Sequence, residues 1–438
     1  MDRTIQIRTA LAAGPVPAGA LCKGLGVTRP TLARALASMP AEIVTLGAAR
    51  ATQYALRDTL RGLPDMAVYR VNATGQIETL GQLTAVRSEG FVMRDSSGQT
   101  TYYEGMPWWL TDMRPQGFLG RAYARQHAVT LGLPSDVRHW SDTDALRALL
   151  VNGSDAVGNL LIGDLARERF VNAKTPLVVS TNDYPRLAEE ALTVGETWSS
   201  AGGEQPKFCT YCDKGHVLVK FSVADDNNVA ERWRDLLLAE HHALETLYAG
   251  GVSAAQSRVV EVGVQHFLEL ERFDRVGVYG RHALISLAAL DGEFVGNATA
   301  PWPVVTAELA RQKIITAQAH ADAMLLFAFG TLIANTDMHS GNLSFVSDTG
   351  RPYALSPAYD MLPMAFSPTS GGLVRDAIGV AHLHACVEGP AWRRALELAQ
   401  NFMSRLRSDA RFSANFEPCI RALNAHLEDA SQKIARIG

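Results

Sequence analysis

The sequence reads Asn335-Thr-Asp337-Met-His339-Ser-Gly-Asn342 directly after an apolar run that is typical of a helix. A second carboxylate, Asp360, follows a short strand-like segment and a turn. A kinase needs one carboxylate to accept the proton of the substrate hydroxyl. It also needs an amide oxygen on Mg²⁺ and a second carboxylate that joins Mg²⁺ to the nucleotide phosphates. A polar loop followed by a surface turn could have the same sequence. The kinase interpretation therefore needs support from other parts of the chain.

A loop of small residues lies upstream, Ser199-Ser200-Ala-Gly202-Gly203-Glu-Gln-Pro-Lys207. Glycines allow backbone N–H groups to approach a phosphate without obstruction by side chains. The loop therefore has the composition of a phosphate-binding segment.

The residues after this loop predict a strand over 217–222 that contains Lys220. A lysine in an apolar strand needs a counter-charge, which a nucleotide phosphate and a glutamate would provide. Glu231 and Glu240 both lie on the helix predicted over 230–249, and the sequence leaves open which of them pairs with Lys220.

A further strand with alternating charges, Phe267-Leu-Glu269-Leu-Glu271-Arg-Phe273-Asp274-Arg275, suits a hinge that contacts adenine. The loop, the lysine strand, the helix, the hinge and the Asp–Asn loop follow one another in the order that a kinase requires. Together they are far less expected by chance than any one of them.

At these motifs the chain resembles the HipA-type Ser/Thr kinase toxins of bacterial type II toxin–antitoxin systems. The resemblance runs from about residue 66 to the C-terminus and is most similar to the single-chain YjjJ (HipH) subtype, in which a helix-turn-helix precedes the kinase. It implies that Asp337 is the catalytic base and that Asn342 and Asp360 hold Mg²⁺. It also implies an ATP-binding set, which comprises Gly202, Gly203, Lys207, Lys220, Glu271, Phe273 and His339.

The resemblance also implies regulation and targets. In family members a serine of the Gly-rich loop is autophosphorylated, which ejects the loop and silences the enzyme. In this sequence that serine is Ser200, with Ser199 as the alternative. The family's targets are aminoacyl-tRNA synthetases, and a HipB-like antitoxin would be a partner.

The N-terminal residues predict three helices and a hairpin, which together make a winged helix-turn-helix. Helices are expected over 4–12, over 18–25 and from Thr28 onward, and strands over 42–46 and 52–56. In that geometry four residues of the third helix would face the major groove and Arg50 would meet DNA from the wing. The four residues are Thr28, Arg29, Thr31 and Arg34. A helical docking domain that never touches DNA is the alternative.

Composition and charge agree with a multidomain protein. The chain has 438 residues, of which 47% are hydrophobic and 20% are charged, with a formal net charge of −4. Residues 1–60 carry a net charge of +4, so that −8 is left for the remainder. This asymmetry restricts contact with nucleic acid to the N-terminus. Five cysteines without framework spacing suit a reducing cytosol. Cys209 and Cys212 with His216 lack a fourth zinc ligand, so a hairpin turn is favoured there.

The sequence thus predicts an α+β protein, in which a winged helix-turn-helix precedes a HipA-like two-lobed kinase fold with a mainly helical C-lobe. The expected domains are 1–62 for DNA binding, 63–150 as a β-rich subdomain, 151–275 as the N-lobe and 276–438 as the C-lobe.

The expected function is that of an ATP- and Mg²⁺-dependent Ser/Thr kinase toxin in the cytoplasm, without a membrane segment, and a homodimer is a further expectation. The alternative is a DNA-binding regulator or DNA-acting toxin. Its kinase-like body would sense nucleotide or perform other metal-dependent phosphoryl chemistry.

Overall fold

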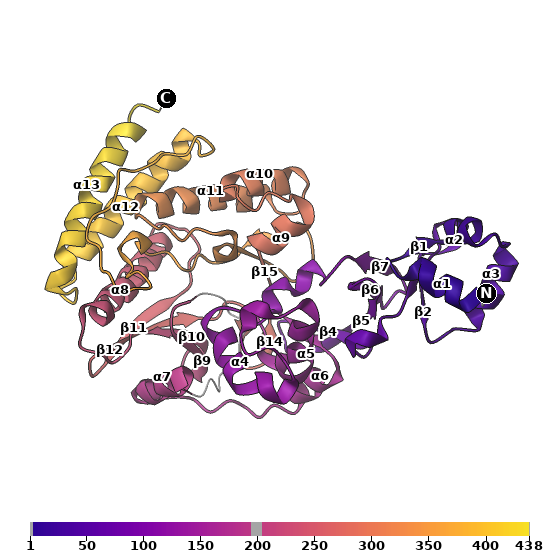
Figure 1. Ribbon diagram of the computed structural model, residues 1–438. Coiled ribbons are helices and arrows are strands. Elements are labelled where there is room, and N and C mark those ends of the chain that lie inside the picture. The colour runs from indigo at the N-terminus through magenta and orange to yellow at the C-terminus, as the bar shows by residue number, and fades with distance from the viewer. Residues whose placement is uncertain (1–2, 194–203, 438) are drawn as a thin grey trace.

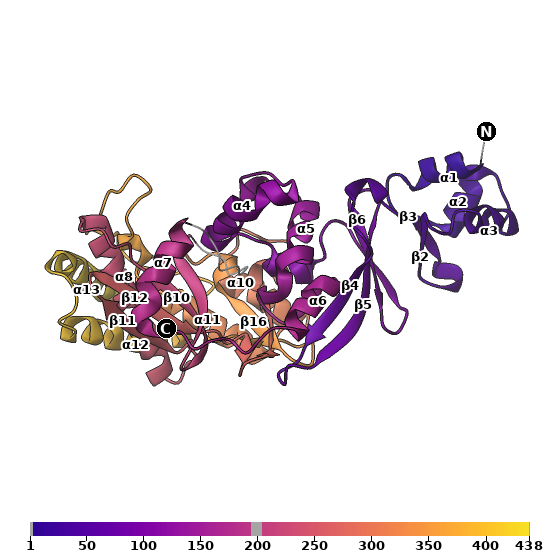
Figure 2. The ribbon, with the colours of Figure 1, turned by 90° about the horizontal axis from the view of Figure 1, so that it is seen from below.

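The computed structural model describes residues 3–193 and 204–437, and it mixes helices and strands as the sequence predicted. Figure 1 shows an elongated molecule whose small N-terminal part projects from a larger body, and the view from below in Figure 2 agrees. The expected loop residues Ser199, Ser200, Gly202 and Gly203 lie outside the described residues.

The N-terminal part has the order of elements expected for a winged helix-turn-helix. Its elements are α1 (Arg3–Leu11), β1 (Val16–Pro17), α2 (Ala18–Leu25), α3 (Arg29–Ala37), β2 (Ile43–Leu46) and β3 (Gln53–Leu56). The strands form an antiparallel sheet in the order β1-β3-β2. Ile7 and Leu11 of α1, like Leu32 and Leu36 of α3, stand four residues apart on one helix face, and Leu21 of α2 joins them in a common core. Gly26 ends α2 with a φ of 63°, a conformation that glycine adopts without strain.

A second apolar layer attaches this part to its neighbour. Val44, Leu46 and Ala55 of the β2–β3 hairpin are buried against Val86 and Val92 of the next sheet. Backbone hydrogen bonds across this junction reinforce the contact. The N-terminal elements are therefore docked on the body by a packed sheet-to-sheet interface.

The middle unit is a five-stranded antiparallel sheet in the order β7-β6-β5-β4-β8. Its strands are β4 (Met66–Val71), β5 (Ile77–Val86), β6 (Gly90–Asp95), β7 (Thr100–Tyr103) and β8 (Leu160–Ile162), accompanied by η3 (Trp108–Met113), α4 (Gly117–Leu131), α5 (Asp142–Asn152) and α6 (Asp164–Val171). The expected domain boundary between residues 150 and 151 falls inside this unit, because β8 pairs with β4. The helix α5 begins at Asp142, since Ser141 and Asp144 form a capping box there.

The next part of the body is built on a four-stranded sheet in the order β11-β12-β10-β9. Its elements are α7 (Tyr184–Thr193), β9 (Lys207–Cys212), β10 (Gly215–Phe221), α8 (Asn228–Ala249), β11 (Ser257–Val262) and β12 (Gln265–Glu271). Asn227 caps α8 by accepting hydrogen bonds from two backbone N–H groups. Cys209 and Cys212 lie within β9, and the expected hairpin turn follows them, between β9 and the strand β10 that contains Lys220.

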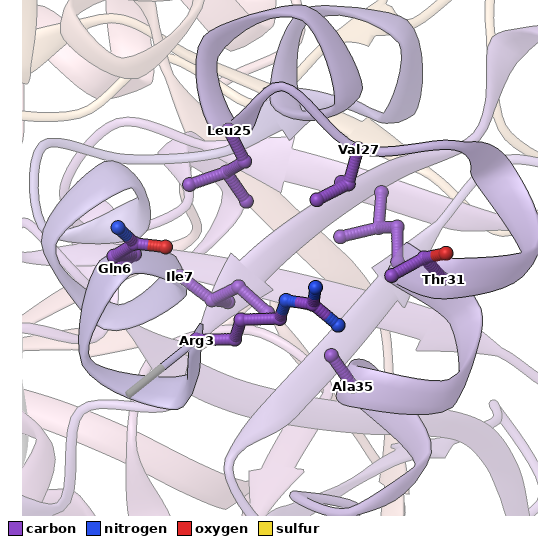
Figure 3. A pocket seen from close by; sticks show the side chains of 8 residues that line it. Arg3, Gln6, Ile7, Leu25, Val27, Thr31 and Ala35 are labelled. Carbon is purple, nitrogen blue, oxygen red and sulfur yellow. The ribbon is translucent and has the colours of Figure 1, made fainter. Parts of the chain in front are cut away.

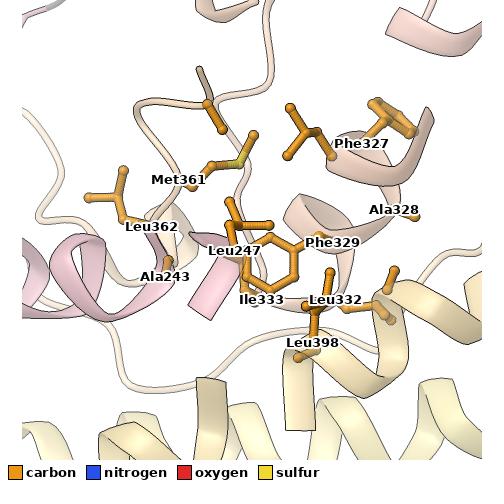
Figure 4. Close-up of a cluster of buried hydrophobic side chains, with 14 of the residues drawn as sticks. Ala243, Leu247, Phe327, Ala328, Phe329, Leu332, Ile333, Met361, Leu362 and Leu398 are labelled. Carbon is orange, nitrogen blue, oxygen red and sulfur yellow. The ribbon is translucent and has the colours of Figure 1, made fainter. Parts of the chain in front are cut away.

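The C-terminal part is mainly helical, as predicted. Its elements are β13 (Arg275–Val276), β14 (Gly280–Arg281), β15 (Ala283–Ser286), α9 (Leu287–Phe294), α10 (Trp302–Arg311), α11 (Ala317–Leu332), β16 (Ser344–Ser347), β17 (Ala354–Leu355), α12 (Gly389–Ser408) and α13 (Glu417–Ile434). Figure 4 shows α8, α11 and α12 meeting around Leu247, Phe329 and Leu398, with Met361 above them. Because α11 is packed in the core, the position at which the following polar loop begins is fixed by that packing. Within the described ranges, no helix combines the length and the apolar character needed to cross a membrane.

Candidate active site

Lys220 is the centre of a buried charged group. It lies in β10, is 3% exposed, and donates to both carboxylate oxygens of Glu240 at 2.6 and 2.8 Å. It also donates to the carboxylate of Asp360. Glu240 is therefore the partner of Lys220, whereas Glu231 accepts a hydrogen bond from Asn415 at 2.9 Å. The pair fixes the middle of α8 against the sheet.

The opposite charges set the protonation of this group. Burial alone would lower the pKa of Lys220, but the carboxylates of Asp360 and Glu240 outweigh burial and hold that pKa above its ordinary value. Burial would likewise raise the pKa of Asp360, but the ammonium groups of Lys220 and Lys207 hold it below the ordinary value. Asp360 is therefore ionised at neutral pH, as a metal ligand must be.

Lys207 is a second buried lysine beside this group, at the start of β9. Burial lowers its pKa to about 8; the carboxylate of Asp360 opposes this, and the charge of Lys220 adds to it. A bound polyphosphate would favour the charged form of Lys207. The predicted role of Lys207 in nucleotide binding stays a prediction.

Asn335 ties the two predicted carboxylate segments together. Its Nδ2 donates to the backbone carbonyl of Asp360 at 3.2 Å, and its Oδ1 accepts from the backbone N–H of Asp337 at 3.0 Å. Asp360 has a φ of +54°, a left-handed conformation that costs a non-glycine residue roughly 1 kcal/mol. Asn335 and Lys220 hold Asp360 in this conformation. Sequence reasoning gave Asn335 no role, although its position at the end of an apolar helix was a usable signal.

Asp337 stands exposed on the loop after α11. Partial burial raises the pKa of its carboxyl, and nearby His339 offsets part of this effect. A carboxylate with a raised pKa accepts a proton more readily than an ordinary one. The role of Asp337 as the catalytic base stays a prediction.

The rest of the loop is braced internally. His339 accepts from the N–H of Gly341 at 3.0 Å through Nδ1, and its carbonyl accepts from the indole N–H of Trp302 at 3.1 Å. The Tyr359 hydroxyl donates to the carbonyl of Gly341 at 3.1 Å and lies 2.7 Å from Oγ of Ser344. Tyr359 thus joins the loop to Asp360, and it was missed in the sequence because a tyrosine before an aspartate carries no distinctive signal.

Asn342 and Asp360 fit a magnesium site. The Nδ2 of Asn342 donates to the carbonyl of Asp337 at 2.9 Å, which leaves its side-chain oxygen available. Asp360 uses Oδ1 for Lys220 and retains Oδ2. Mg²⁺ in phosphoryl-transfer sites binds one or two protein oxygens together with phosphates and water. Within the residues that the structure describes, no group of three or more His, Cys, Asp or Glu side chains could hold a metal ion.

The predicted hinge residues lie at the end of β12. The N–H of Glu271 donates to the carbonyl of Gln256 at 3.0 Å, so this donor is used inside the sheet. In the described part of the chain, the N–H of Phe273 has no hydrogen bond. The Phe273 ring lies 5.8 Å from that of Tyr359. Phe273 therefore keeps the backbone donor that an adenine would need.

The predicted DNA-contact residues lie on one end of the molecule. Arg29, Arg34 and Arg50 are exposed, whereas Thr31 is half-buried. The hydroxyl of Thr28 lies 3.0 Å from that of Thr31 and makes no capping bond to the helix backbone. The helix expected from Thr28 onward is α3, and Thr28 occupies its N-cap position.

Arg3 adds a cation that sequence reasoning missed. Figure 3 shows its side chain extending from α1 toward Thr31 and Ala35 of α3, at a small pocket between the helices. Only the folded arrangement brings Arg3 beside α3. The basic surface of α3 is therefore wider than the sequence predicted.

Comparison with known proteins identifies the family. Residues 199–428, more than half of the chain, match the model of the HipA-like C-terminal domain. The chain belongs to the HipA family. Residues 63–171 match the middle domain of YjjJ-like toxins. Toxin YjjJ of Escherichia coli K12 is 38% identical over an alignment of 438 positions that covers 98% of each chain. The resemblance to HipA-type toxins is thereby confirmed.

Solved structures support the HipA fold. The complex of HipA, HipB and operator DNA from Shewanella oneidensis MR-1 contains a chain that matches with a TM-score of 0.53 and 12% identity, over 85% of this chain and 99% of that one. The proinflammatory kinase CtkA of Helicobacter pylori matches 54% of this chain and 94% of its own, also at 12% identity. Its TM-score of 0.40 is too low to support a conclusion.

Proposed function

We propose that this HipA-family protein is an ATP- and Mg²⁺-dependent serine/threonine protein kinase toxin that inhibits growth. Its target would be a component of translation such as an aminoacyl-tRNA synthetase. The observation that carries the proposal is the buried Lys220–Glu240–Asp360 group, which lies beside a loop that presents Asp337 and Asn342. These are the charges that phosphoryl transfer requires, and each has a partner that positions it.

In the proposed reaction, Asp337 accepts the proton of the substrate hydroxyl as this oxygen attacks the γ-phosphate. Lys220 would neutralise phosphate charge in the transition state, with Glu240 holding its ammonium in place. Asn342 and Asp360 would hold Mg²⁺, which supplies further charge stabilisation when bound. Asn335 keeps the base segment and the metal segment at a fixed separation.

Regulation would come from the Gly-rich loop, where Gly202 and Gly203 would cradle phosphate. Ser200, or alternatively Ser199, would be autophosphorylated, and the added charge of about −2 would draw the loop out of the site. Label that persists unchanged in both the Ser200→Ala and the Ser199→Ala variants would contradict this part of the proposal.

Residues 1–62 would bind DNA through Thr28, Arg29, Thr31, Arg34 and Arg50, with Arg3 as an addition. Exposed guanidinium groups on α3 and at the hairpin are suited to phosphate and base contacts. A solved relative is in complex with HipB and operator DNA, which supports a HipB-like antitoxin as a further partner. The proposed location is the cytoplasm, and the proposed assembly is a homodimer.

The second candidate function is that of a DNA-binding regulator or DNA-acting toxin whose body senses nucleotide or performs other metal-dependent phosphoryl chemistry. The exposed basic residues of α3, on a winged-helix part packed firmly onto the body, favour it.

Growth arrest and DNA binding can be tested separately to distinguish the two functions. The Asp337→Ala variant should abolish growth arrest and retain DNA binding, whereas the Arg29→Ala/Arg34→Ala variant should lose DNA binding and retain arrest. Arrest that persists in Asp337→Ala would favour the second candidate.

A further inference from the structure

A cavity of about 310 Å³ lies between the middle unit and the C-terminal part. One wall is the sheet face formed by Leu80 and Met93, and the opposite wall is formed by Ala283 and Ile285 of β15. Trp108 and Trp109 of η3 complete the apolar lining. Volumes of this size are found in small-molecule sites.

The apolar lining contains one carboxylate without a cation, Asp112. Its Oδ2 accepts from the backbone N–H of Ser286 at 2.6 Å. In the described ranges, Asp112 has no ion pair, and Ser286 is its hydrogen-bond partner. Asp112 is half-buried because its side chain borders the cavity. Burial raises the pKa of this carboxyl, and the hydrogen bonds from Ser286 oppose part of that effect.

A cationic side chain also lines the cavity but does not compensate Asp112. Arg70 lines the cavity and donates at 2.7 Å to Glu78, its cross-strand neighbour in β5. Arg351, near the cavity, lies with its guanidinium 4.3 Å from the Phe294 ring centroid and 5.7 Å from that of Trp108. Both guanidinium groups are therefore engaged elsewhere.

We infer that this cavity is a binding site for a small aromatic amine, whose ring would lie among the apolar side chains and whose ammonium would pair with Asp112. An aromatic ring gains from contact with Trp108 and Trp109, and a buried ammonium–carboxylate contact needs both charges present. The site is distinct from the Lys220 group, and the inference does not depend on kinase activity.

The position of the cavity connects it to the active site. Its wall strand β15 pairs with β16, in the register Ser286 to Ser344, and Ser344 contacts the Tyr359 hydroxyl. The N–H of Leu287 donates to the carbonyl of Leu343, directly after Asn342. An occupant of the cavity would therefore contact β15, which pairs with β16, the strand that follows the Asp–Asn loop.

Calorimetric titration of the full chain with tryptamine, and with indole-3-propionate as an anion of similar shape, tests the inference. Tryptamine should bind saturably at one site, at least tenfold tighter than the anion. The Asp112→Asn variant, which keeps an acceptor for Ser286, should bind tryptamine at least tenfold more weakly. Glu104→Gln changes an exposed carboxylate of the same unit and should bind like wild type.

A second variant provides an independent test in case Asp112→Asn fails to fold. Ala283→Leu fills part of the cavity and should also weaken tryptamine binding, and thermal unfolding shows whether each variant is folded. The inference is overturned if wild type shows no saturable binding of tryptamine. It is equally overturned if a folded Asp112→Asn or Ala283→Leu variant binds as wild type does.

Discussion

Single residues determine the charge of the candidate site, and Lys207 shows this most directly. Its pKa of about 8 lies below the ordinary 10.5, because burial disfavours the ammonium. The unfolded chain therefore holds this proton more tightly between pH 8 and 10.5, and wild-type stability should rise with pH over that interval. Lys207→Met should be more stable than wild type at pH 7, by up to about 3 kcal/mol. Urea unfolding at several pH values measures the difference, which should vanish above pH 10.5.

Asn335 is the residue whose removal should separate positioning from folding. Asn335→Ala loses two hydrogen bonds inside the protein and should cost about 1–3 kcal/mol of unfolding free energy. Because it releases the segments of Asp337 and Asp360, it should lower kcat at least tenfold while the KM for ATP changes little. Asn342→Ala, as a comparison, should raise the Mg²⁺ concentration needed for activity. Equal kinetic behaviour of the two variants would contradict the positioning role.

At the scale of elements, α11 packs closely at Gly330 against Met338 of the loop that follows it. A methyl group there would overlap the sulfur of Met338, which follows Asp337. Gly330→Ala should therefore destabilise the protein by about 1–3 kcal/mol through overpacking. The same change in a Met338→Ala background should be stabilising, since alanine is favoured over glycine in a helix by about 1 kcal/mol. A double-mutant cycle by thermal unfolding measures this coupling, and additive effects would contradict it.

Elements with local signals were predictable from the sequence, and elements that depend on distant partners were not. The bounds expected for α2 agree with the structure because Pro17 and Gly26 bracket it. The strand with Lys220 was recognisable from its apolar neighbours, but its partner Glu240 needed the packing of α8. The role of β8 escaped prediction because three residues gain strand geometry only by pairing with β4. Tyr359 acts through tertiary hydrogen bonds, so its sequence context could not show its role, whereas the position of Asn335 after an apolar helix did offer a signal.

At the scale of the whole molecule, a buried ion cluster joins the middle unit to the body. Asp274 accepts from Arg272 at 3.1 Å, from Arg275 at 2.6 Å and from the N–H of Gly158 at 3.0 Å. Burial alone would raise the pKa of Asp274, but the two guanidinium groups hold it well below its ordinary value. The carboxylate therefore contributes stability above its unfolded-state pKa, and that contribution is lost as the pH falls.

Asp274→Asn should test this junction. Because the variant leaves the buried guanidinium groups of Arg272 and Arg275 with Asp155 as the one remaining carboxylate of the cluster, it should lose about 3–5 kcal/mol of unfolding free energy at pH 7. Its stability should also fall less steeply in acid than that of wild type. Urea unfolding between pH 3 and 7 measures both effects, with Glu104→Gln as a surface control. A loss below about 1 kcal/mol would show that the cluster does not stabilise the junction.

The central claim is that this molecule transfers phosphate from ATP by means of Asp337. The most direct test is incubation of the purified protein with γ-labelled ATP and Mg²⁺, followed by mapping of the phosphorylated residue, with Asp337→Ala as the control. The account predicts label on Ser200 or Ser199 in wild type and none in the variant. Absence of label in a wild-type protein that binds ATP, or equal labelling of the variant, would contradict it.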